Sequence, residues 1–435
     1  MTTAEGGDKK LATKILISLA GGAIAGVAAN ALFGKAQWLV WMVENVTRPV
    51  GQVWLRALIM IVIPLVFASL TLGVAGLGDI RKVGRIGLKT MAYFILSSTL
   101  ATLIGLAILN VVKPGEGLPD EIRDEMMANF GSDADAKAAG AEGVSFGVDM
   151  LVNMVPRNPI RSAAQDDMIG LIFFALIFGA ALSILPAEKA KPMLGFLEAM
   201  GDAVVVIIGW VMQLAPIGVF ALIFSVVALF GFEIMQKLMW YVLAVLAGLL
   251  FHFVVVYSIL IRTLGGMNPL YFFSRIRSVI ITAFSTSSSN ATLPTTIAIT
   301  QKNLNVPRGI AGFVLPLGAT MNLDGSALFG GITVLFIAQV FGLELTLGTQ
   351  FVVVVMAVIT SVGAAGVPSG MIPLLMMVLT VIGLPPGAIA LVLGVDRILD
   401  MCRTAVNVTG DMAASVVIAR SEGYDLSAPE ATPAD

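Results

Sequence analysis

The sequence contains almost no cysteine or histidine. Its 435 residues include one cysteine, Cys402, and one histidine, His252. A single cysteine can form neither a disulfide framework nor a thiolate metal cluster. A single histidine, which lies in an apolar run and is expected to be buried beside a hydrogen-bonding partner, is too little for a histidine metal site or a Ser/His/Asp hydrolase. With no visible nucleophile–base pair, the sequence does not predict an enzyme.

Charge is scarce as well. Charged residues make up 12% of the chain, the formal net charge is −2, and no basic run could follow the phosphates of a nucleic acid. Hydrophobic residues make up 57% of the chain, which is more than a soluble domain of this size can bury. The sequence therefore predicts an all-α membrane protein that crosses the lipid bilayer several times and has no nucleic-acid partner.

Long apolar runs predict eight transmembrane helices. They cover residues 15–33, 53–77, 86–112, 168–185, 194–230, 238–261, 310–341 and 395–417, and Pro64 is expected to break the second run mildly. Lysines and arginines beside the first runs place the N-terminus in the cytoplasm, and the order of the spans returns the C-terminus to the same side. The expected location is the plasma (inner) membrane. Residues 1–14 form the cytoplasmic N-terminus and lack a small-residue cleavage site, so the first run is expected to be a retained span. The acid-rich residues 116–142 are expected to form an external loop, and residues 421–435 a disordered C-terminal tail.

Three apolar regions after residue 277 are interrupted. The interruptions are the serine-rich tip 285–290, the break 322–326 and the glycine-rich tip 363–370. At a rise of about 1.5 Å per residue, the short helices beside the two tips cannot cross a hydrocarbon layer of about 30 Å. They predict two re-entrant helical hairpins, one from each side, and a broken seventh span. Paired hairpins of opposite orientation are typical of inverted-repeat transporters with a site at the membrane midplane.

The last apolar run has one polar face. On a helical wheel, the residues that fall within an arc of roughly 100° are Asp396, Asp400, Arg403, Thr404, Asn407 and Asp411. An ionised residue at the bilayer centre costs about 2.5–3.5 kcal/mol, and this arc holds three aspartates against one arginine, with Arg397 at its edge. The face is either a structural ion-pair network or a binding site whose positive charge arrives as cations and substrate.

The interruptions offer polar groups that suit different ligands. The serine tip exposes backbone N–H groups at a helix N-terminus, which attract a carboxylate without a formal charge. The glycine tip offers carbonyl groups and freedom of movement, which suit a cation or a gate, with a turn of no function as the alternative. Oxygen ligands from Asn322, Asp324 and Asp411 suit a hard monovalent cation such as Na⁺ better than zinc or copper.

Four motifs stand in order along the second half of the chain. They are the serine-rich hairpin, LPLGATMNLDGSA from residue 315, AAGVPSG from residue 364 and DRILDMCRTAVNVTGD from residue 396. Together they resemble the glutamate/aspartate transporter family, the dicarboxylate/amino acid:cation symporters. The resemblance implies a homotrimer in which each protomer has a rigid scaffold and a mobile transport domain that moves as an elevator. It places the scaffold in residues 15–261, except for the spans 86–112 and 238–261, which join residues 262–420 in the transport domain.

The resemblance also assigns substrate contacts. Arg403 would clamp the side-chain carboxylate of an acidic amino acid and Asp400 would hold its amino group. Thr404 and Asn407 would lie near the amino group and the α-carboxylate. Further expected contacts lie in the broken segments and hairpin tips, and these are Ser326, Ser287, Ser288, Ser289, Val367 and Pro368.

Three cation sites follow from the same resemblance. The first would combine Asp411 with the carbonyls of Gly318, Asn322 and Asn407, the second Asp324 with Asn322, Ser97, Ser98 and the carbonyl of Phe94, and the third the carbonyls of Thr320, Ser361, Val362 and Ala364. Leu323, Ser97 and Phe94 stand where sodium-coupled members frequently have methionine, threonine and tyrosine. The ion stoichiometry is therefore not predicted. Potassium counter-transport is not predicted either, because Ser287 and Met401 stand where members of the family carry an additional arginine.

The predicted function is a secondary active symporter for L-aspartate or L-glutamate. Na⁺ is the expected coupling ion, and H⁺ is the alternative. A C4-dicarboxylate symporter is the alternative within the class, and an anion channel is the alternative outside it. A channel needs a continuous lining, whereas paired hairpins indicate gates on opposite sides that need not open together.

Overall fold

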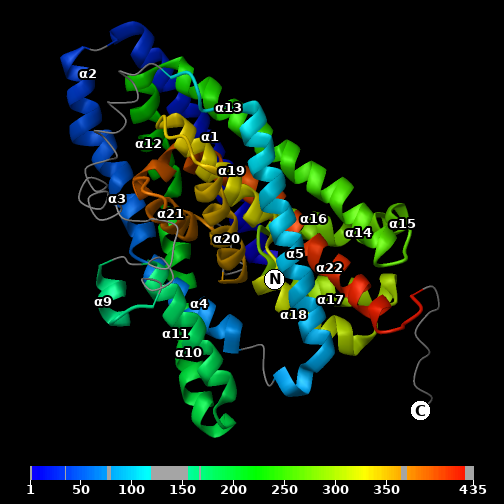
Figure 1. Ribbon diagram of the computed structural model, residues 1–435. Helices are drawn as coiled ribbons and strands as arrows, with labels where there is room; N and C mark the ends of the chain where they lie inside the picture. Colours follow the sequence, from blue (N-terminus) through cyan, green and yellow to red (C-terminus); the bar gives the residue numbers. More distant parts are fainter. Residues whose placement is uncertain are drawn as a thin grey trace.

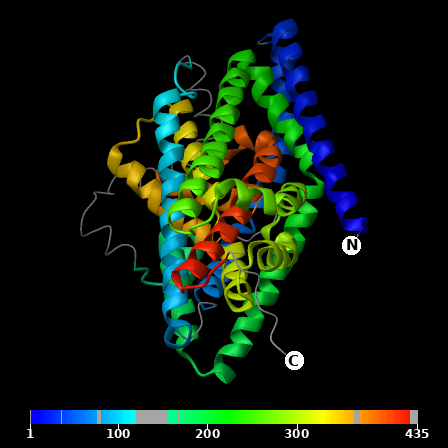
Figure 2. The same ribbon diagram turned by 90° about the vertical axis from the view of Figure 1, so that its right-hand side faces the viewer.

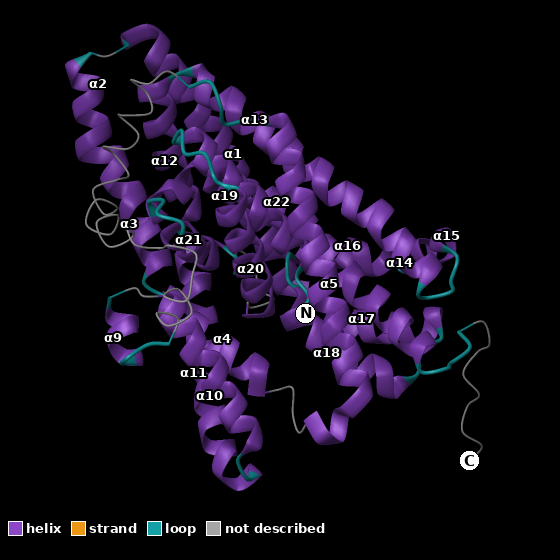
Figure 3. Ribbon diagram, in the orientation of Figure 1, coloured by secondary structure: helices purple, strands orange, loops and turns teal. Residues whose placement is uncertain are grey.

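The protein is helical in every region that the structure describes, and those regions contain no strand (Figure 3). The computed structural model describes residues 2–34, 36–75, 80–118, 155–165, 168–363 and 370–426. The α-helices in chain order are α1 (Thr2–Phe33), α2 (Gln37–Met42), α3 (Arg48–Ile59), α4 (Val62–Ala75), α5 (Ile80–Val112), α9 (Pro159–Ala164), α10 (Met168–Ile184), α11 (Ala187–Gln213), α12 (Ala215–Phe230), α13 (Phe232–Phe251), α14 (Tyr257–Thr263), α15 (Pro269–Arg275), α16 (Arg277–Thr286), α17 (Ser289–Leu304), α18 (Arg308–Met321), α19 (Asp324–Val340), α20 (Leu347–Gly363), α21 (Ile372–Val381) and α22 (Ala390–Ser421). Two π-helical segments, Val43–Thr47 and His252–Val256, connect α2 to α3 and α13 to α14.

Several helices have the length and composition of membrane spans. In the described residues, five helical stretches are long and apolar enough to cross a membrane, namely Thr13–Phe33, Arg85–Val112, Ala187–Gln213, Ile234–Thr263, which joins α13 to α14, and Arg308–Val340, which joins α18 to α19. Shorter apolar helices are Ile63–Leu72, Phe173–Ile184, Ala215–Leu229 and Leu347–Ser361. The predicted helical membrane fold is confirmed to this extent, and the count of eight spans stays a prediction.

Prolines divide two of the predicted spans. The run 53–77 becomes α3 and α4, which are separated after Ile59 because Pro64 has no N–H to donate to the carbonyl one turn earlier. The run 194–230 becomes α11 and α12, which meet at Leu214 because Pro216 occupies the first turn of α12. The mild break predicted at Pro64 is thus a complete division, and the expectation of one continuous helix over 194–230 was wrong.

The serine tip is a tight turn between α16 and α17. Only Ser287 and Ser288 lie outside the helices, so the predicted tip 285–290 was too wide. Ser287 ends α16 in the left-handed conformation, with φ of 51°. The Ser288 hydroxyl then accepts a hydrogen bond of 3.2 Å from the Ala291 N–H at the start of α17.

The other two interruptions differ in extent. Only Asn322 and Leu323 separate α18 from α19, so the predicted break at 322–326 was wrong for Asp324, Gly325 and Ser326, which form the first turn of α19. The predicted glycine tip falls between α20 and α21, and its residues 364–369 lie outside the described residues.

The helices form two parts, which we call the N-terminal bundle (α1–α4 and α9–α12) and the core (α5 and α13–α22). In the N-terminal bundle, α1 packs along α12, and α4 packs against α10 and α11, a pair that extends from one end of the molecule in Figure 1. In the core, α19 packs against α5 and α22. Figure 2 shows α22 (orange to red) between α5 (cyan) and α1 (blue). The last helix is therefore surrounded by both parts.

Hydrogen bonds connect α5 to the other helices of the core at both ends and in the middle of α5. Near one end, Asn110 Nδ2 donates to Gln350 Oε1 at 2.9 Å. Near the other end, Lys89 Nζ donates to Glu422 Oε1 at 2.7 Å, directly after the end of α22. In the middle, Ser97 Oγ donates to Asp324 Oδ2 at 2.5 Å. Residues 421–426, which the sequence places in the tail, thus begin as an ordered part of the core.

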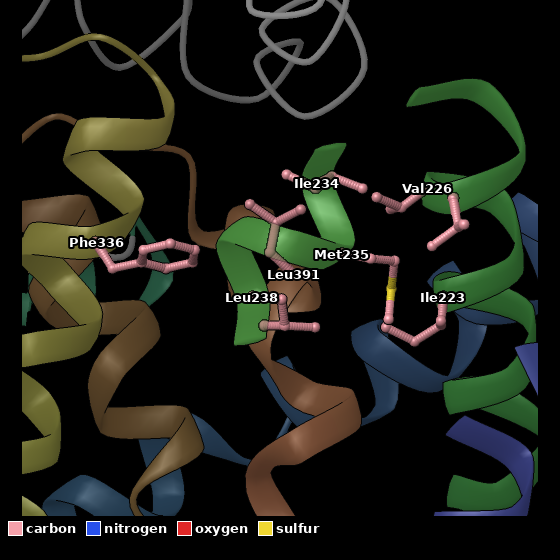
Figure 4. A pocket seen from close by; sticks show the side chains of 8 residues that line it. Ile223, Val226, Ile234, Met235, Leu238, Phe336 and Leu391 are labelled. Carbon is pink, nitrogen blue, oxygen red and sulfur yellow. The ribbon is translucent and has the colours of Figure 1, made fainter. Parts of the chain in front are cut away.

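The boundary between the two parts is apolar. Side-chain hydrogen bonds between described residues, such as Asn30 Nδ2 to the Ala228 carbonyl at 2.9 Å, stay within one part or the other. Gly394 of α22 lies against Leu19 of α1 and Ile223 of α12, where an added Cβ would come within 2.7 Å of Leu19 and 2.9 Å of Ile223. A cavity lined by apolar side chains of α12, α13, α19 and α22, among them Ile223 and Leu391, lies on the same boundary (Figure 4).

Candidate functional site

The polar face of α22 is buried in the core. The helix runs from Ala390 to Ser421, which is longer at both ends than the predicted 395–417, and its side chains are buried along almost its whole length. Asp396, Arg403 and Asp411 are 3%, 0% and 2% exposed. A single helix thus brings ionisable groups to the interior of an otherwise apolar protein.

Arg403 pairs with two aspartates of its own helix. Its Nη1 donates to Asp396 Oδ1 at 2.9 Å, and its Nη2 donates to Asp400 Oδ1 at 2.6 Å. The guanidinium also lies over the ring of Phe329, with 3.9 Å from Cζ to the ring centroid. Thr404 donates its hydroxyl to the Asp400 carbonyl at 2.8 Å. Arg403, Asp400 and Thr404, all predicted as substrate contacts, therefore lie together.

Arg397 is buried too, and this corrects the charge count made from the sequence. Its side chain is 5% exposed, and its Nε has no hydrogen-bonding partner among the described residues. Asp396 and Asp400 are then balanced by Arg397 and Arg403 within the span 396–403. The excess negative charge lies elsewhere.

Asn407 joins α22 to the start of α19. Its Oδ1 accepts a hydrogen bond of 2.8 Å from the Gly325 N–H, and its Nδ2 donates to Ser326 Oγ at 3.3 Å. A Cβ on Gly325 would lie 2.8 Å from the Arg403 carbonyl, so glycine permits this close approach. Ser326 and Asn407 thus lie on the same surface as Arg403.

Asp324 receives hydrogen bonds from three hydroxyl groups. Ser97 and Ser98 donate at 2.5 and 2.8 Å, and Tyr257 donates at 2.9 Å. His252 Nε2 lies 3.6 Å from Asp324 Oδ2. His252 is fully buried as expected, but the expected hydrogen-bonding partner is absent, since neither ring nitrogen makes a hydrogen bond. Sequence reasoning grouped Asp324 with both serines but missed Tyr257 and His252.

Asp411 lies beside the break between α18 and α19. Its Oδ1 accepts a hydrogen bond of 3.0 Å from Asn322 Nδ2, and a Cβ on Gly318 would lie 2.5 Å from the same oxygen. A Cβ on Gly410 would lie 3.0 Å from both Asn322 Nδ2, which binds Asp411, and Asp324 Oδ2, so both side chains lie close to the backbone of Gly410. No described lysine or arginine forms an ion pair with either carboxylate. Buried, unpaired carboxylates are costly unless a cation neutralises them.

The remaining predicted ligands are only partly connected to this cluster. Ser361 Oγ lies 3.5 Å from Ser98 Oγ, which brings the third expected set next to the second. Phe94 is fully buried in α5, and Thr320 donates its hydroxyl to the Leu317 carbonyl at 3.1 Å. Val362 belongs to α20. Ala364, Val367 and Pro368 lie outside the described residues.

The serine turn lies next to α22, because both α16 and α17 pack against that helix. Ser287, Ser288 and Ser289 are 2%, 8% and 3% exposed, and the Ser287 hydroxyl has no hydrogen-bonding partner. Hydroxyl and backbone N–H groups are thus held in a buried position beside the polar face. This agrees with a carboxylate-binding turn but does not test it.

A chain with several membrane-length helices, broken helices and buried carboxylates beside the breaks is a multi-pass membrane transporter, not an enzyme. Residues 11–421 match the Sodium:dicarboxylate symporter family, and the chain belongs to this family. The predicted resemblance is therefore confirmed, and the protein is a cation-coupled symporter.

Curated relatives cover most of the chain. The Proton/glutamate-aspartate symporter of Escherichia coli (strain K12) is 36% identical over 383 residues, which is 88% of this chain and 86% of the relative. The Proton/sodium-glutamate symport protein of Bacillus subtilis (strain 168) is 36% identical over 414 residues, 95% of this chain and 93% of the relative. The C4-dicarboxylate transport protein of the same organism is 32% identical over 393 residues, 90% and 91% of the two chains.

Proposed function

We propose that this symporter moves acidic amino acids, L-aspartate or L-glutamate, across the plasma (inner) membrane together with Na⁺. The observation that carries the proposal is the buried contact of 2.6 Å between Asp400 and Arg403. A substrate with a distal carboxylate and an ammonium group can enter between these side chains. Its carboxylate would replace Asp400 on the Arg403 fork, and its ammonium would pair with the released Asp400.

A C4-dicarboxylate is the second candidate, and the names of the relatives support both substrates. Arg403 could bind the carboxylate of either one. Asp400 separates them, because succinate would displace it from Arg403 without offering a positive charge in return. A buried carboxylate left unpaired costs several kcal/mol, so we favour the amino acid by roughly a hundredfold or more.

The cations would neutralise Asp324 and Asp411. Asp324 with Ser97, Ser98 and Asn322, and Asp411 with Asn322, offer only oxygen ligands to a hard monovalent ion. The carbonyls of Gly318, Asn407, Phe94, Thr320, Ser361, Val362 and Ala364 complete the proposed sets. A proton on a buried carboxylate would meet the same electrostatic need, which keeps H⁺ as the alternative.

Movement of the core against the N-terminal bundle would carry the substrate. The apolar boundary at Gly394 supports this, because sliding would break no hydrogen bond between described side chains of the two parts. We assign the bundle to the scaffold of a homotrimer and the core to the transport domain. Eight spans, two re-entrant hairpins and cytoplasmic termini complete this proposal.

Uptake by the purified protein in proteoliposomes tests the function. Labelled L-aspartate should accumulate under an inward Na⁺ gradient and not when choline replaces sodium at fixed pH. Unlabelled succinate at the same concentration as aspartate should compete poorly. Equal uptake in choline would replace sodium with protons as the coupling ion, and equal competition by succinate would support the dicarboxylate.

The Asp400→Ser variant tests whether the substrate is an acidic amino acid or a C4-dicarboxylate. It should lose aspartate binding by about a hundredfold, because the ammonium loses its partner. Succinate binding should become stronger, because no buried carboxylate is then left without a partner. A parallel loss of both ligands would show that Asp400 acts only by supporting Arg403.

A further inference from the structure

The Tyr257 hydroxyl lies between Asp324 and the backbone of α22. Tyr257 is fully buried at the start of α14, and its ring packs edge-on against His252, with 4.8 Å between the ring centroids. Its hydroxyl oxygen lies 2.9 Å from Asp324 Oδ2 and 3.1 Å from the Val406 carbonyl oxygen. One side chain thus touches a proposed cation ligand and the helix that carries the proposed substrate contacts.

A phenol hydroxyl has a single hydrogen, so it cannot donate fully to both acceptors. While Asp324 is ionised and no cation is bound, the charge-assisted bond to the carboxylate is the stronger of the two. A cation held by Asp324 reverses this preference, because it repels the hydrogen and attracts the lone pairs of the phenol oxygen. The hydrogen then turns to the Val406 carbonyl.

We propose that Tyr257 is a positioning residue that reports the cation occupancy of Asp324 to the substrate-binding segment of α22. Val406 lies next to Asn407 and two residues after Thr404, so a bond to its carbonyl fixes the backbone that carries both side chains. This inference rests on the proposed function, since it needs a cation at Asp324 and a substrate on α22. It explains how a cation would strengthen substrate binding without touching the substrate.

Gly410 provides the space for this hydroxyl. A Cβ on Gly410, one turn after Val406, would lie 2.5 Å from the Tyr257 hydroxyl oxygen. Any side chain there would push the hydroxyl away from one or both acceptors. Gly410 of α22 therefore leaves the room that the Tyr257 hydroxyl of α14 needs to reach both acceptors.

Tyr257→Phe tests the proposal, because it removes the hydroxyl and keeps the ring that packs on His252. Aspartate binding to the purified full-length protein would be measured over a range of sodium concentrations. Aspartate affinity at saturating sodium should fall about tenfold, because the bond to the Val406 carbonyl is lost there, and aspartate affinity at low sodium should stay near wild type, so that the affinity depends less on sodium. Gly410→Ala should shift the sodium dependence in the same direction.

Tyr241→Phe is the matched control. Tyr241 is a fully buried tyrosine of α13 whose hydroxyl bonds to Thr333 Oγ1 at 2.8 Å. The Tyr241→Phe substitution should leave the sodium dependence of aspartate binding unchanged. An unchanged sodium dependence in Tyr257→Phe, or an equal loss of aspartate affinity at every sodium concentration, would overturn the inference. A wild-type protein that binds aspartate independently of sodium would instead refute the proposed function.

Discussion

The N-terminal bundle and the core bury polar side chains in different ways. In the bundle, Asn30 and Trp54 donate to backbone carbonyls of neighbouring helices, at 2.9 Å to Ala228 and 3.0 Å to Val211. In the core, buried carboxylates accept hydrogen bonds from side chains far away in the sequence, as Asp324 does from Ser97. Buried polar side chains in the bundle thus hold neighbouring helices together, whereas those in the core surround buried carboxylates.

This difference teaches where function resides in a membrane protein. Neutral side chains that bond a carbonyl cost little in the membrane and stabilise the helix packing. Ionised groups cost much more, so their gathering in one part marks that part as the site. The apolar boundary keeps the polar groups of the two parts separate.

The largest effect is expected at Arg403. Arg403→Thr should abolish aspartate binding, with a loss of more than about a hundredfold, because the distal carboxylate loses the planar fork that the proposal assigns to Arg403. Calorimetric titration with aspartate would measure the loss. Arg403→Lys keeps the charge without the planar fork, so its aspartate affinity should lie between those of Arg403→Thr and wild type. Retained aspartate affinity in the threonine variant would remove Arg403 from its role.

Asp411→Asn should weaken aspartate binding about tenfold at low sodium and much less at high sodium. The carboxylate is proposed to hold a cation, and binding of cation and substrate is reciprocally linked. Titration of aspartate at two sodium concentrations measures the change. Equal affinity at low sodium in the variant and in wild type would count against a cation site at Asp411.

Gly394→Leu should slow uptake about tenfold and leave aspartate binding unchanged. The added side chain would collide with Leu19 and Ile223 at the boundary between the two parts. Initial uptake rates in proteoliposomes and equilibrium binding separate the two effects. Gly312→Leu is the control, because nothing lies within 4 Å of a Cβ at Gly312. An unchanged uptake rate in Gly394→Leu would show that the parts do not slide at this contact.

The smallest effect concerns the pH dependence of stability at Glu422. Hydrogen bonds from Arg85 and Lys89 lower the pKa of Glu422 below its usual value. Stability gained from this group is therefore present above its unfolded pKa and is lost as the pH falls through the folded pKa. The melting temperature of wild type should exceed that of Glu422→Gln by a few degrees at neutral pH, and the difference should vanish in acid.

Glu116→Gln is the control for that measurement. Glu116 pairs with Lys113 at 2.8 Å, but both side chains are about half exposed, so the pair should contribute little. A loss of stability in Glu116→Gln equal to that in Glu422→Gln would mean that the contact between α5 and the end of α22 has no special role.

The sequence was informative where burial of polarity is costly. The polar face of α22 and the break at Asn322 were predictable because such residues have no other reason to interrupt an apolar run. The divisions at Pro64 and Pro216 were underestimated, since a proline in the first turn of a helix looks the same as one in a kinked helix. The local sequence pattern predicted which helices exist better than it predicted the residues at which they begin and end.

Contacts between distant residues could not be predicted from the pattern. Tyr257 and Phe329 lie in apolar runs where aromatic residues are ordinary, and only the packing of α14 and α19 brings them to Asp324 and Arg403. The burial of Arg397 likewise depends on the helices that surround α22. The contact of His252 with Asp324, and the lack of a hydrogen bond at either ring nitrogen, also depend on the tertiary structure alone.

The two unpaired carboxylates make the core sensitive to membrane voltage. While Asp324 and Asp411 are ionised and no cation is bound, the proposed mobile part carries two negative charges through the electric field. Each elementary charge that crosses a potential of 100 mV is worth about 2.3 kcal/mol, so two are worth about 4.6 kcal/mol. An interior that is negative would drive the unloaded core toward the outer face, and the resting cell would thereby reset its own carrier for the next substrate.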